Sequence, residues 1–262
     1  MLKPGSLLDR GWRVVGTGLS FAVFGIGACL ISLTVFPALR LVSPQPEVAR
    51  RRIQRAMQQT FRLFAWMMMS VFGVVSFEFR NLERLAREGR LIVANHPSLI
   101  DVVLIISQMP AVDCIVKQGL WRNPFLRWPV VWAGYIPNTT PERLVEECAQ
   151  ALRAGHSLLV FPEGTRTVPG QPLQFKRGAA QIALAARCDI VPITITQTIP
   201  TLTKAEQWYQ VPRECSHWVI SVDEPMPIEP YLQSAPSLAA RHLTQHLLDY
   251  YSGRLGAPAA AV

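Results

Sequence analysis

The sequence contains few cysteines, and they form no recognisable motif. There are five in 262 residues, an odd number without a Cys-x-x-Cys pair. This pattern excludes a disulfide framework of the secreted kind and a cysteine-rich zinc site. The five are predicted to be free thiols in a reducing compartment. They are Cys29, Cys114, Cys148, Cys188 and Cys215.

Two common catalytic signatures are also missing. No Gly-x-Ser-x-Gly run is present, which argues against a serine nucleophile and a covalent acyl-enzyme. His242 and His246 are four residues apart, but Leu243 follows the first histidine where a zinc protease has glutamate. We therefore expect no metal ion and no other resident cofactor.

Charged side chains are scarce at 17%, and they are distributed unevenly. No charged residue occurs between Arg13 and Arg40, and the apolar run 14–39 is long enough to cross a bilayer as a helix. A signal peptide is the alternative, but the run is too long and no small-residue cleavage site follows it. We expect a retained membrane helix.

A second apolar stretch, residues 63–77, is short for a crossing. Between the two apolar stretches lies a basic amphipathic segment that suits an anionic membrane surface. Its basic residues are Arg50, Arg51, Arg52 and Arg55. If both stretches crossed, this segment would lie outside and break the positive-inside rule, so we expect one crossing or a re-entrant hairpin. Either places the remainder of the chain at the cytoplasmic face of the inner membrane.

The net charge of +8 raises the question of nucleic-acid binding. No zinc-finger, basic-zipper or RNP-type pattern accompanies the charge, and part of it is juxtamembrane. The expected macromolecular partner is the lipid membrane, and no nucleic acid is expected.

The remainder of the chain alternates apolar runs with helical periodicity, as in an α/β domain. Strands are predicted at residues 76–80, 91–94, 114–116, 157–161, 190–196 and 218–222. Helices are predicted from Pro141 to about Gly155, over 178–187, and over a C-terminal segment that begins near Leu238. The fold class is thus α/β, a single domain with a central mixed sheet flanked by helices, preceded by an N-terminal membrane-associated helical segment. The expected divisions are membrane-anchoring helices at 1–75, the α/β domain at 76–252 and a disordered tail at 253–262.

The first polar cluster follows the apolar run 91–94. His96 and Asp101 lie five positions apart in Asn-His-Pro-Ser-Leu-Ile-Asp, with Pro97 predicted to open a helix. A histidine titrates near neutral pH, and a carboxylate on its far ring nitrogen would orient it and stabilise the imidazolium. A surface histidine beside a helix-start carboxylate is the simpler alternative if the motif stands alone.

The second polar cluster is Phe-Pro-Glu-Gly-Thr-Arg, residues 161–166, after another apolar run. Polar clusters at the carboxyl ends of strands converge on one site in open α/β sheets. Together these blocks resemble the first and third signature blocks of the glycerolipid acyltransferases of the 1-acylglycerol-3-phosphate acyltransferase type. Residues 175–179 and 191–193 resemble segments that follow in the same family, so the resemblance covers about residues 77–195.

The resemblance implies that residues 76–252 are an acyltransferase domain, and it implies an activity and roles for particular residues. The implied activity is transfer of a fatty acyl group from an acyl carrier protein or coenzyme A thioester to the hydroxyl of a lysophospholipid, with His96 as base and Asp101 as its orienting acid. The third block implies acceptor binding by Glu163, Gly164, Thr165 and Arg166, in which Glu163 bonds the acceptor hydroxyl and Arg166 grips an anionic head group. Lys117 and Arg177, near predicted strand ends, are candidates for phosphate contacts.

Two departures from the family pattern affect the acceptor. Asn138 ends a block that usually ends in arginine, and Gly119 stands where the family has glutamate. A lyso-aminolipid or specialised lipid therefore stays open as the acceptor. A non-catalytic lipid-binding protein is the alternative from another class, although such a protein has no need for the His96 base.

Overall fold

The computed structural model describes residues 5–119 and 127–256. Within them a seven-stranded sheet has the order β1-β7-β6-β2-β5-β3-β4. All neighbouring strands are parallel except β6 and β7, which are antiparallel. The expected mixed sheet in a single α/β domain is confirmed. The strands are β1 (Val75–Arg80), β2 (Leu91–Ala94), β3 (Asp113–Lys117), β4 (Ile136–Asn138), β5 (Leu158–Val160), β6 (Ile190–Gln197) and β7 (Ser216–Val222).

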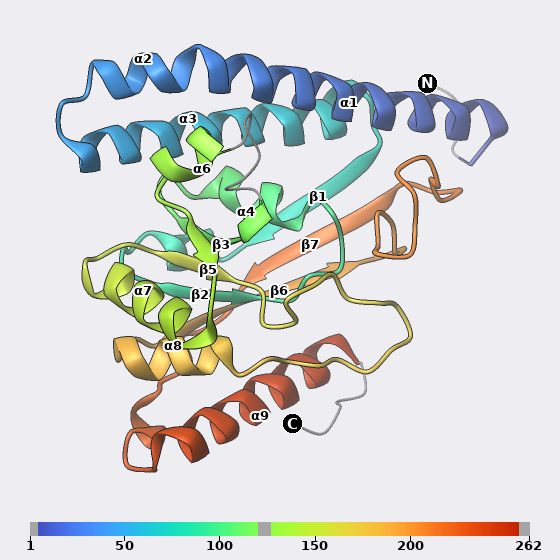
Figure 1. The fold of residues 1–262 in the computed structure, drawn as a ribbon. Coiled ribbons are helices and arrows are strands. Elements are labelled where there is room, and N and C mark those ends of the chain that lie inside the picture. Colours follow the sequence, from blue (N-terminus) through green and yellow to red (C-terminus); the bar gives the residue numbers. More distant parts are fainter. Residues whose placement is uncertain (1–4, 120–126, 257–262) are drawn as a thin grey trace.

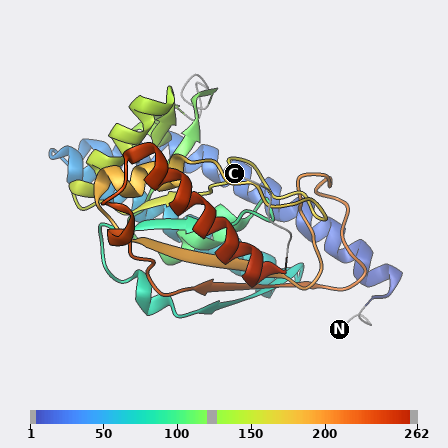
Figure 2. The same cartoon turned by 90° about the horizontal axis from the view of Figure 1, so that it is seen from below.

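Helices cover both faces of the sheet (Figures 1 and 2). One face carries α1 (Leu7–Leu33), α2 (Val35–Leu41), α3 (Pro46–Trp66), α4 (Asp101–Gln108) and α6 (Arg127–Trp132), and the other carries α7 (Pro141–Arg153), α8 (Gly178–Ala186) and α9 (Pro236–Leu255). Short helical turns lie at η1 (Met67–Val71), η2 (Leu82–Leu85) and η3 (Glu229–Tyr231). Because both faces are covered, every residue of β2 is buried, which explains its uninterrupted apolar sequence.

The predicted apolar N-terminal helix is present but divides into α1 and α2 after Leu33. Residues 7–41 are the one stretch of the described chain that is long and apolar enough to cross a membrane. The helix also packs along the domain: Phe24 contacts Phe61 and Phe64 of α3, and the indole of Trp12 donates to the carbonyl of Phe72 at 2.9 Å. Its opposite side leaves large apolar side chains exposed.

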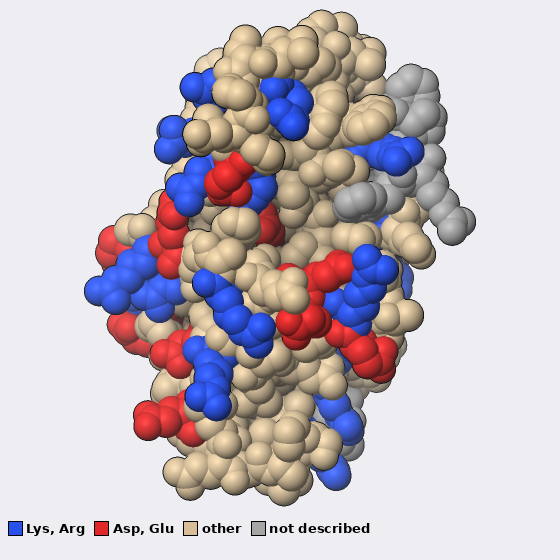
Figure 3. Space-filling model, turned by 60° about the vertical axis from the view of Figure 1, so that its left-hand side comes forward, with Lys and Arg blue, Asp and Glu red and all other residues tan. Residues whose placement is uncertain are grey.

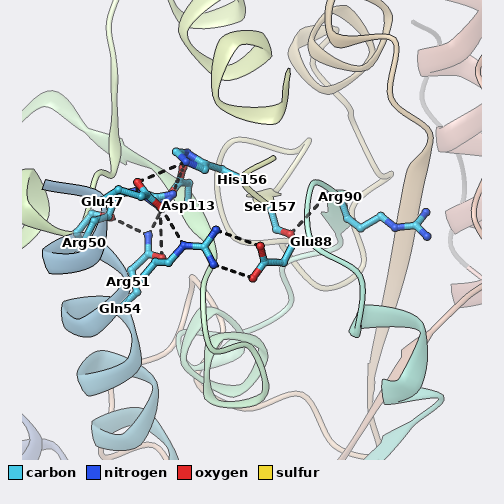
Figure 4. A network of polar contacts seen from close by, with 10 residues as sticks. Glu47, Arg50, Arg51, Gln54, Glu88, Arg90, Asp113, His156 and Ser157 are labelled. Atoms are coloured by element: carbon cyan, nitrogen blue, oxygen red, sulfur yellow. Dashed lines mark hydrogen bonds and ion pairs between the residues drawn. The ribbon is translucent and has the colours of Figure 1, made fainter. Parts of the chain in front are cut away.

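The basic segment differs from the sequence-based expectation of four arginines at a membrane surface. Arg50 points into the protein, where its guanidinium lies 3.3 Å from the buried carboxylate of Asp113 (Figure 4). Gln54 donates to the same carboxylate at 2.8 Å, and Arg51 forms a two-bond pair with Glu88. A buried carboxylate needs such partners. Arg50 and Asp113 are 63 positions apart in the chain, so no local sequence pattern indicates that they pair.

Further parts of the described chain also differ from a reading of the sequence alone. Residues 63–77, the apolar stretch that is short for a crossing, form the end of α3, the π-helical turn η1 and the start of β1. The short strand β4 was not expected, because its Pro137 disfavours a strand; as an edge strand it tolerates proline. Helix α9 continues to Leu255, past Gly253 where the disordered tail was expected, and residues 257–262 lie outside the described residues.

Candidate active site

His96 and Asp101 meet just beyond the carboxyl end of β2. The Nδ1 atom of His96 lies 2.9 Å from Oδ2 of Asp101, and the Asp101 side chain is fully buried. Pro97 does not open the helix as predicted, because α4 begins at Asp101 itself. The first residue of the helix thus contacts the ring at its Nδ1 atom.

Asp101 is held by two more hydrogen bonds, both from Ser98. The backbone N–H of Ser98 donates to Oδ2 at 2.6 Å, and its hydroxyl donates to Oδ1 at 2.5 Å. Burial raises the pKa of Asp101, while the bonds from His96 and Ser98 oppose that rise. The carboxylate therefore has a fixed orientation before any substrate arrives.

The third block, residues 161–166, directly follows β5 and lies next to His96, because β5 pairs with β2. Oε1 of Glu163 accepts from the backbone N–H of His96 at 2.9 Å and from the Thr167 hydroxyl at 3.0 Å. In return, the Thr167 N–H donates to the His96 carbonyl at 2.7 Å. These bonds join the two motif blocks at their backbones.

The imidazole is also fixed on one side by an aromatic ring. Phe161 stacks on His96 with 4.2 Å between ring centroids and 29° between planes. Glu163 beside it is 9% exposed, and burial raises the pKa of its carboxyl. Stacking on Phe161 thus fixes the plane of the His96 ring, and burial favours the neutral form of the Glu163 carboxyl.

Arg166 reaches the connection between β6 and β7, residues 198–215. Its Nη1 donates to the carbonyls of Leu202 at 3.1 Å and Thr203 at 2.9 Å. Leu202 has a left-handed backbone (φ 55°), uncommon for leucine, and its carbonyl also accepts from the Leu99 N–H at 3.0 Å. Arg166 and the His96 loop therefore hold one strained turn together.

The other sequence-predicted residues lie at the same edge of the sheet but are less engaged. Gly164 has φ 67°, and a Cβ there would come within 3.0 Å of Lys176 Nζ. Thr165 is exposed, and Arg177 is the exposed N-cap of α8. Lys117 is exposed at the end of β3, paired in register with Asn138 of β4. These four are not drawn into the hydrogen-bonded cluster around His96.

Sequence reasoning did not single out Thr167, Phe161 as a stacking ring, or Leu202. Thr167 directly follows the Phe-Pro-Glu-Gly-Thr-Arg run and was within reach of a motif-based search. Leu202 carries no local signal, because its role depends on a carbonyl oxygen in a long connection. Across the described ranges 5–119 and 127–256, no group of three or more His, Cys, Asp or Glu side chains is placed to hold a metal ion.

A family model described as acyltransferase matches residues 76–196, the part of the chain that carries both motif blocks and the first six strands. Residues 76–196 thus form an acyltransferase-family domain. The resemblance predicted from the motif blocks is confirmed, as is their assignment to the 1-acylglycerol-3-phosphate acyltransferase type.

Among its relatives is a 1-acyl-sn-glycerol-3-phosphate acyltransferase of Cocos nucifera, 30% identical over 190 residues, 68% of this chain and 59% of that protein. An enzyme of the same name from Pseudomonas aeruginosa is 27% identical over 150 residues, 55% of this chain and 58% of that protein. The match thus spans less than two thirds of either relative. The crystal structure of the 1-acyl-sn-glycerophosphate (LPA) acyltransferase PlsC from Thermotoga maritima shares the fold, with a TM-score of 0.62, 18% identity and coverage of 93% and 97% of the two chains.

Proposed function

We propose that this protein is a membrane-bound acyltransferase that moves a fatty acyl group from an acyl carrier protein or coenzyme A thioester to the free hydroxyl of a lysophospholipid such as lysophosphatidic acid. The observation that carries the proposal is the His96–Asp101 pair, joined through Glu163 to the third block. Names of relatives that act on 1-acylglycerol-3-phosphate support the same acceptor class.

The chemistry follows from which ring nitrogen is occupied. In this proposal Nδ1 carries the ring proton and donates a hydrogen bond to Asp101, which leaves Nε2 with a lone pair towards the substrate. As the acceptor oxygen attacks the thioester carbon, Nε2 takes the hydroxyl proton and the carbonyl electrons move onto oxygen. The intermediate then expels the thiolate, and the imidazolium returns the proton to sulfur. Asp101 stabilises the imidazolium during this cycle.

The acceptor is positioned by the third block in this proposal. Oε1 of Glu163 is already used by His96 and Thr167, so Oε2 is the oxygen offered to the acceptor. Nη1 of Arg166 is used by Leu202 and Thr203, so its Nε and Nη2 edge is offered to an anionic head group. Lys117 and Arg177 are proposed as outer phosphate contacts, of the acceptor or of the donor's phosphopantetheine arm.

Membrane association is assigned to the outward face of α1 and α2. Large apolar side chains are exposed along it, among them Leu19, Val23 and Ile26. In Figure 3 the end formed by these helices shows mainly uncharged surface with several Lys and Arg side chains and no Asp or Glu, whereas acidic residues lie over the rest of that face. Because α1 also packs on α3 of the domain, we propose that it lies in the cytoplasmic leaflet of the inner membrane with the domain at its surface.

The test is turnover by the purified full-length protein in detergent micelles. Acyl-coenzyme A and acyl-carrier protein are each offered with a panel of lysolipids that includes lysophosphatidic acid, a lyso-aminolipid and a neutral lysolipid. Thiol release gives the rate, and mass spectrometry identifies the product. A lysophospholipid product above the His96→Ala background supports the proposal. Product from the lyso-aminolipid alone changes the acceptor, and no turnover with any pair favours a non-catalytic lipid-binding role.

A further inference from the structure

An apolar pocket of about 220 Å³ lies beside the loop that carries His96. Its lining comes from three separate parts of the chain: Gly18 and Phe21 of α1, Leu99 of the His96 loop, and Trp208 of the β6–β7 connection. None of these residues takes part in the His96, Asp101 and Glu163 cluster. The pocket therefore lies where the membrane-facing helix meets the candidate active site.

The glycine in this lining is required by the tryptophan. A Cβ atom at Gly18 would lie 2.9 Å from Cζ3 of Trp208, which is shorter than real Cβ contacts, and 3.1 Å from Cη2, which is tighter than most of them. Elsewhere on the same helix, a Cβ at Gly25 would meet nothing within 4 Å. The absence of a side chain at position 18 thus keeps the Trp208 ring against α1.

The pocket is connected to the proposed anion site through one stretch of backbone. Leu99 donates its N–H to the carbonyl of Leu202, and that carbonyl also accepts from Arg166. The β6–β7 connection therefore presents a guanidinium contact at Leu202 and an apolar wall at Trp208. Its far end is fixed to α1, because the side chain of Arg10 donates to the carbonyl of Val211 at 3.2 Å.

We propose that this pocket binds the acyl chain of the lysolipid acceptor close to its head group. The inference rests on the proposed function and adds a subsite to it. A lysophospholipid is an anion with one apolar chain, which matches a guanidinium bonded to this connection and an apolar pocket that the connection helps to line. The pocket wall is α1, whose outward face exposes Val15, Leu19 and Val23, so a chain leaving the bilayer reaches the pocket along an apolar surface.

The experiment compares Gly18→Ile with Gly25→Ile as a matched control on the same helix. The full-length protein is assayed in detergent micelles with lysophosphatidic acids of six- and sixteen-carbon chains and one fixed donor. Each buried methylene contributes about a fourfold factor in affinity, so filling the pocket should raise KM for the long-chain acceptor at least about tenfold. The KM for the short chain, and kcat for both, should stay within about twofold. Gly25→Ile should behave as wild type.

Trp208→Ala is the second variant, because it removes the opposite wall without crowding the helix. Like Gly18→Ile, it should raise KM for the sixteen-carbon acceptor relative to the six-carbon acceptor. It is the deciding variant if Gly18→Ile fails to fold. An unchanged preference in Trp208→Ala, or a change that follows the chain length of the donor, overturns the inference. Absence of turnover in the wild-type protein would instead overturn the proposed function.

Discussion

Replacing Asp101 by asparagine tests how the candidate base is supported. In the wild-type protein, Oδ2 of Asp101 accepts from the His96 ring and the Ser98 N–H, and Oδ1 accepts from the Ser98 hydroxyl. An asparagine can place its oxygen at the Oδ2 position and keep both N–H bonds. Its NH2 group then donates to the Ser98 hydroxyl, which can rotate to accept. The geometry and the histidine tautomer survive, and only the negative charge is lost.

The size of the effect follows from that charge. A hydrogen bond to a charged group contributes about 1.5–3 kcal/mol, which here stabilises the imidazolium formed during transfer. Asp101→Asn should therefore lower kcat about 10- to 150-fold, with little change in KM. Asp101→Ala should cost more activity and also about 1–3 kcal/mol of stability, because Ser98 would keep buried donors without a partner.

The assay is thiol release at saturating acceptor, together with thermal unfolding of each variant. Asp113→Asn is the control: this aspartate is also buried, but it lies at the amino end of β3 and bonds Arg50 and Gln54. It should destabilise the fold, by up to about 3–5 kcal/mol, without lowering kcat at temperatures where the protein is folded. A loss below threefold in Asp101→Asn would refute the role of the charge. A loss beyond about 10⁴-fold would instead indicate an inverted tautomer.

Three other predictions concern the same site. His96→Ala should abolish transfer but leave the protein on membranes in a flotation assay, because the base is lost and the apolar face of α1 is not; wild-type turnover would contradict the mechanism. Arg166→Ala should lower kcat/KM for an anionic acceptor at least about tenfold, and Arg166→Lys should recover part of that loss. An equal loss of kcat/KM with a neutral acceptor would show that the arginine only holds the β6–β7 connection in place. Because burial raises the pKa of Glu163 above its unfolded value, its contribution to stability is full at low pH and is lost as pH rises through the folded pKa. Glu163→Gln keeps both accepted bonds and does not titrate, so its unfolding temperature relative to wild type should rise as the pH is raised from 4 to 8, while activity falls. A difference in unfolding temperature that does not change with pH would show that Glu163 has the same pKa in the folded and unfolded states.

The parts of the fold that could be predicted are those with local signals. Strand β2 was predicted with its observed bounds, because burial on both faces demands an unbroken apolar run. Strand β4 was missed because three residues with a central proline give no such run. The pair between Arg50 and Asp113 was also missed, since 63 positions separate the partners and the arginine looks like any other basic residue in its segment.

The same distinction applies to the site. His96 and Asp101 are five positions apart, so one turn of chain brings them together and the motif is readable. Glu163 was expected near an acceptor, yet its observed partners are the backbone of His96 and the hydroxyl of Thr167. That contact depends on β2 and β5 being neighbours, which is a property of the sheet order and of no single segment.

The pairing of β1 with β7 has a consequence for biosynthesis. Ser76 and His217 are neighbours in the sheet but 141 positions apart in the chain. At a synthesis rate of about 5–20 residues per second, β1 leaves the ribosome roughly 7–28 s before its partner strand β7. During that interval the backbone groups of β1 lack their final ladder, while the apolar helix α1 is already complete. The sheet therefore closes only after the apolar helix α1 is complete, and a nascent chain stalled before Ser216 should be sensitive to proteases along β1.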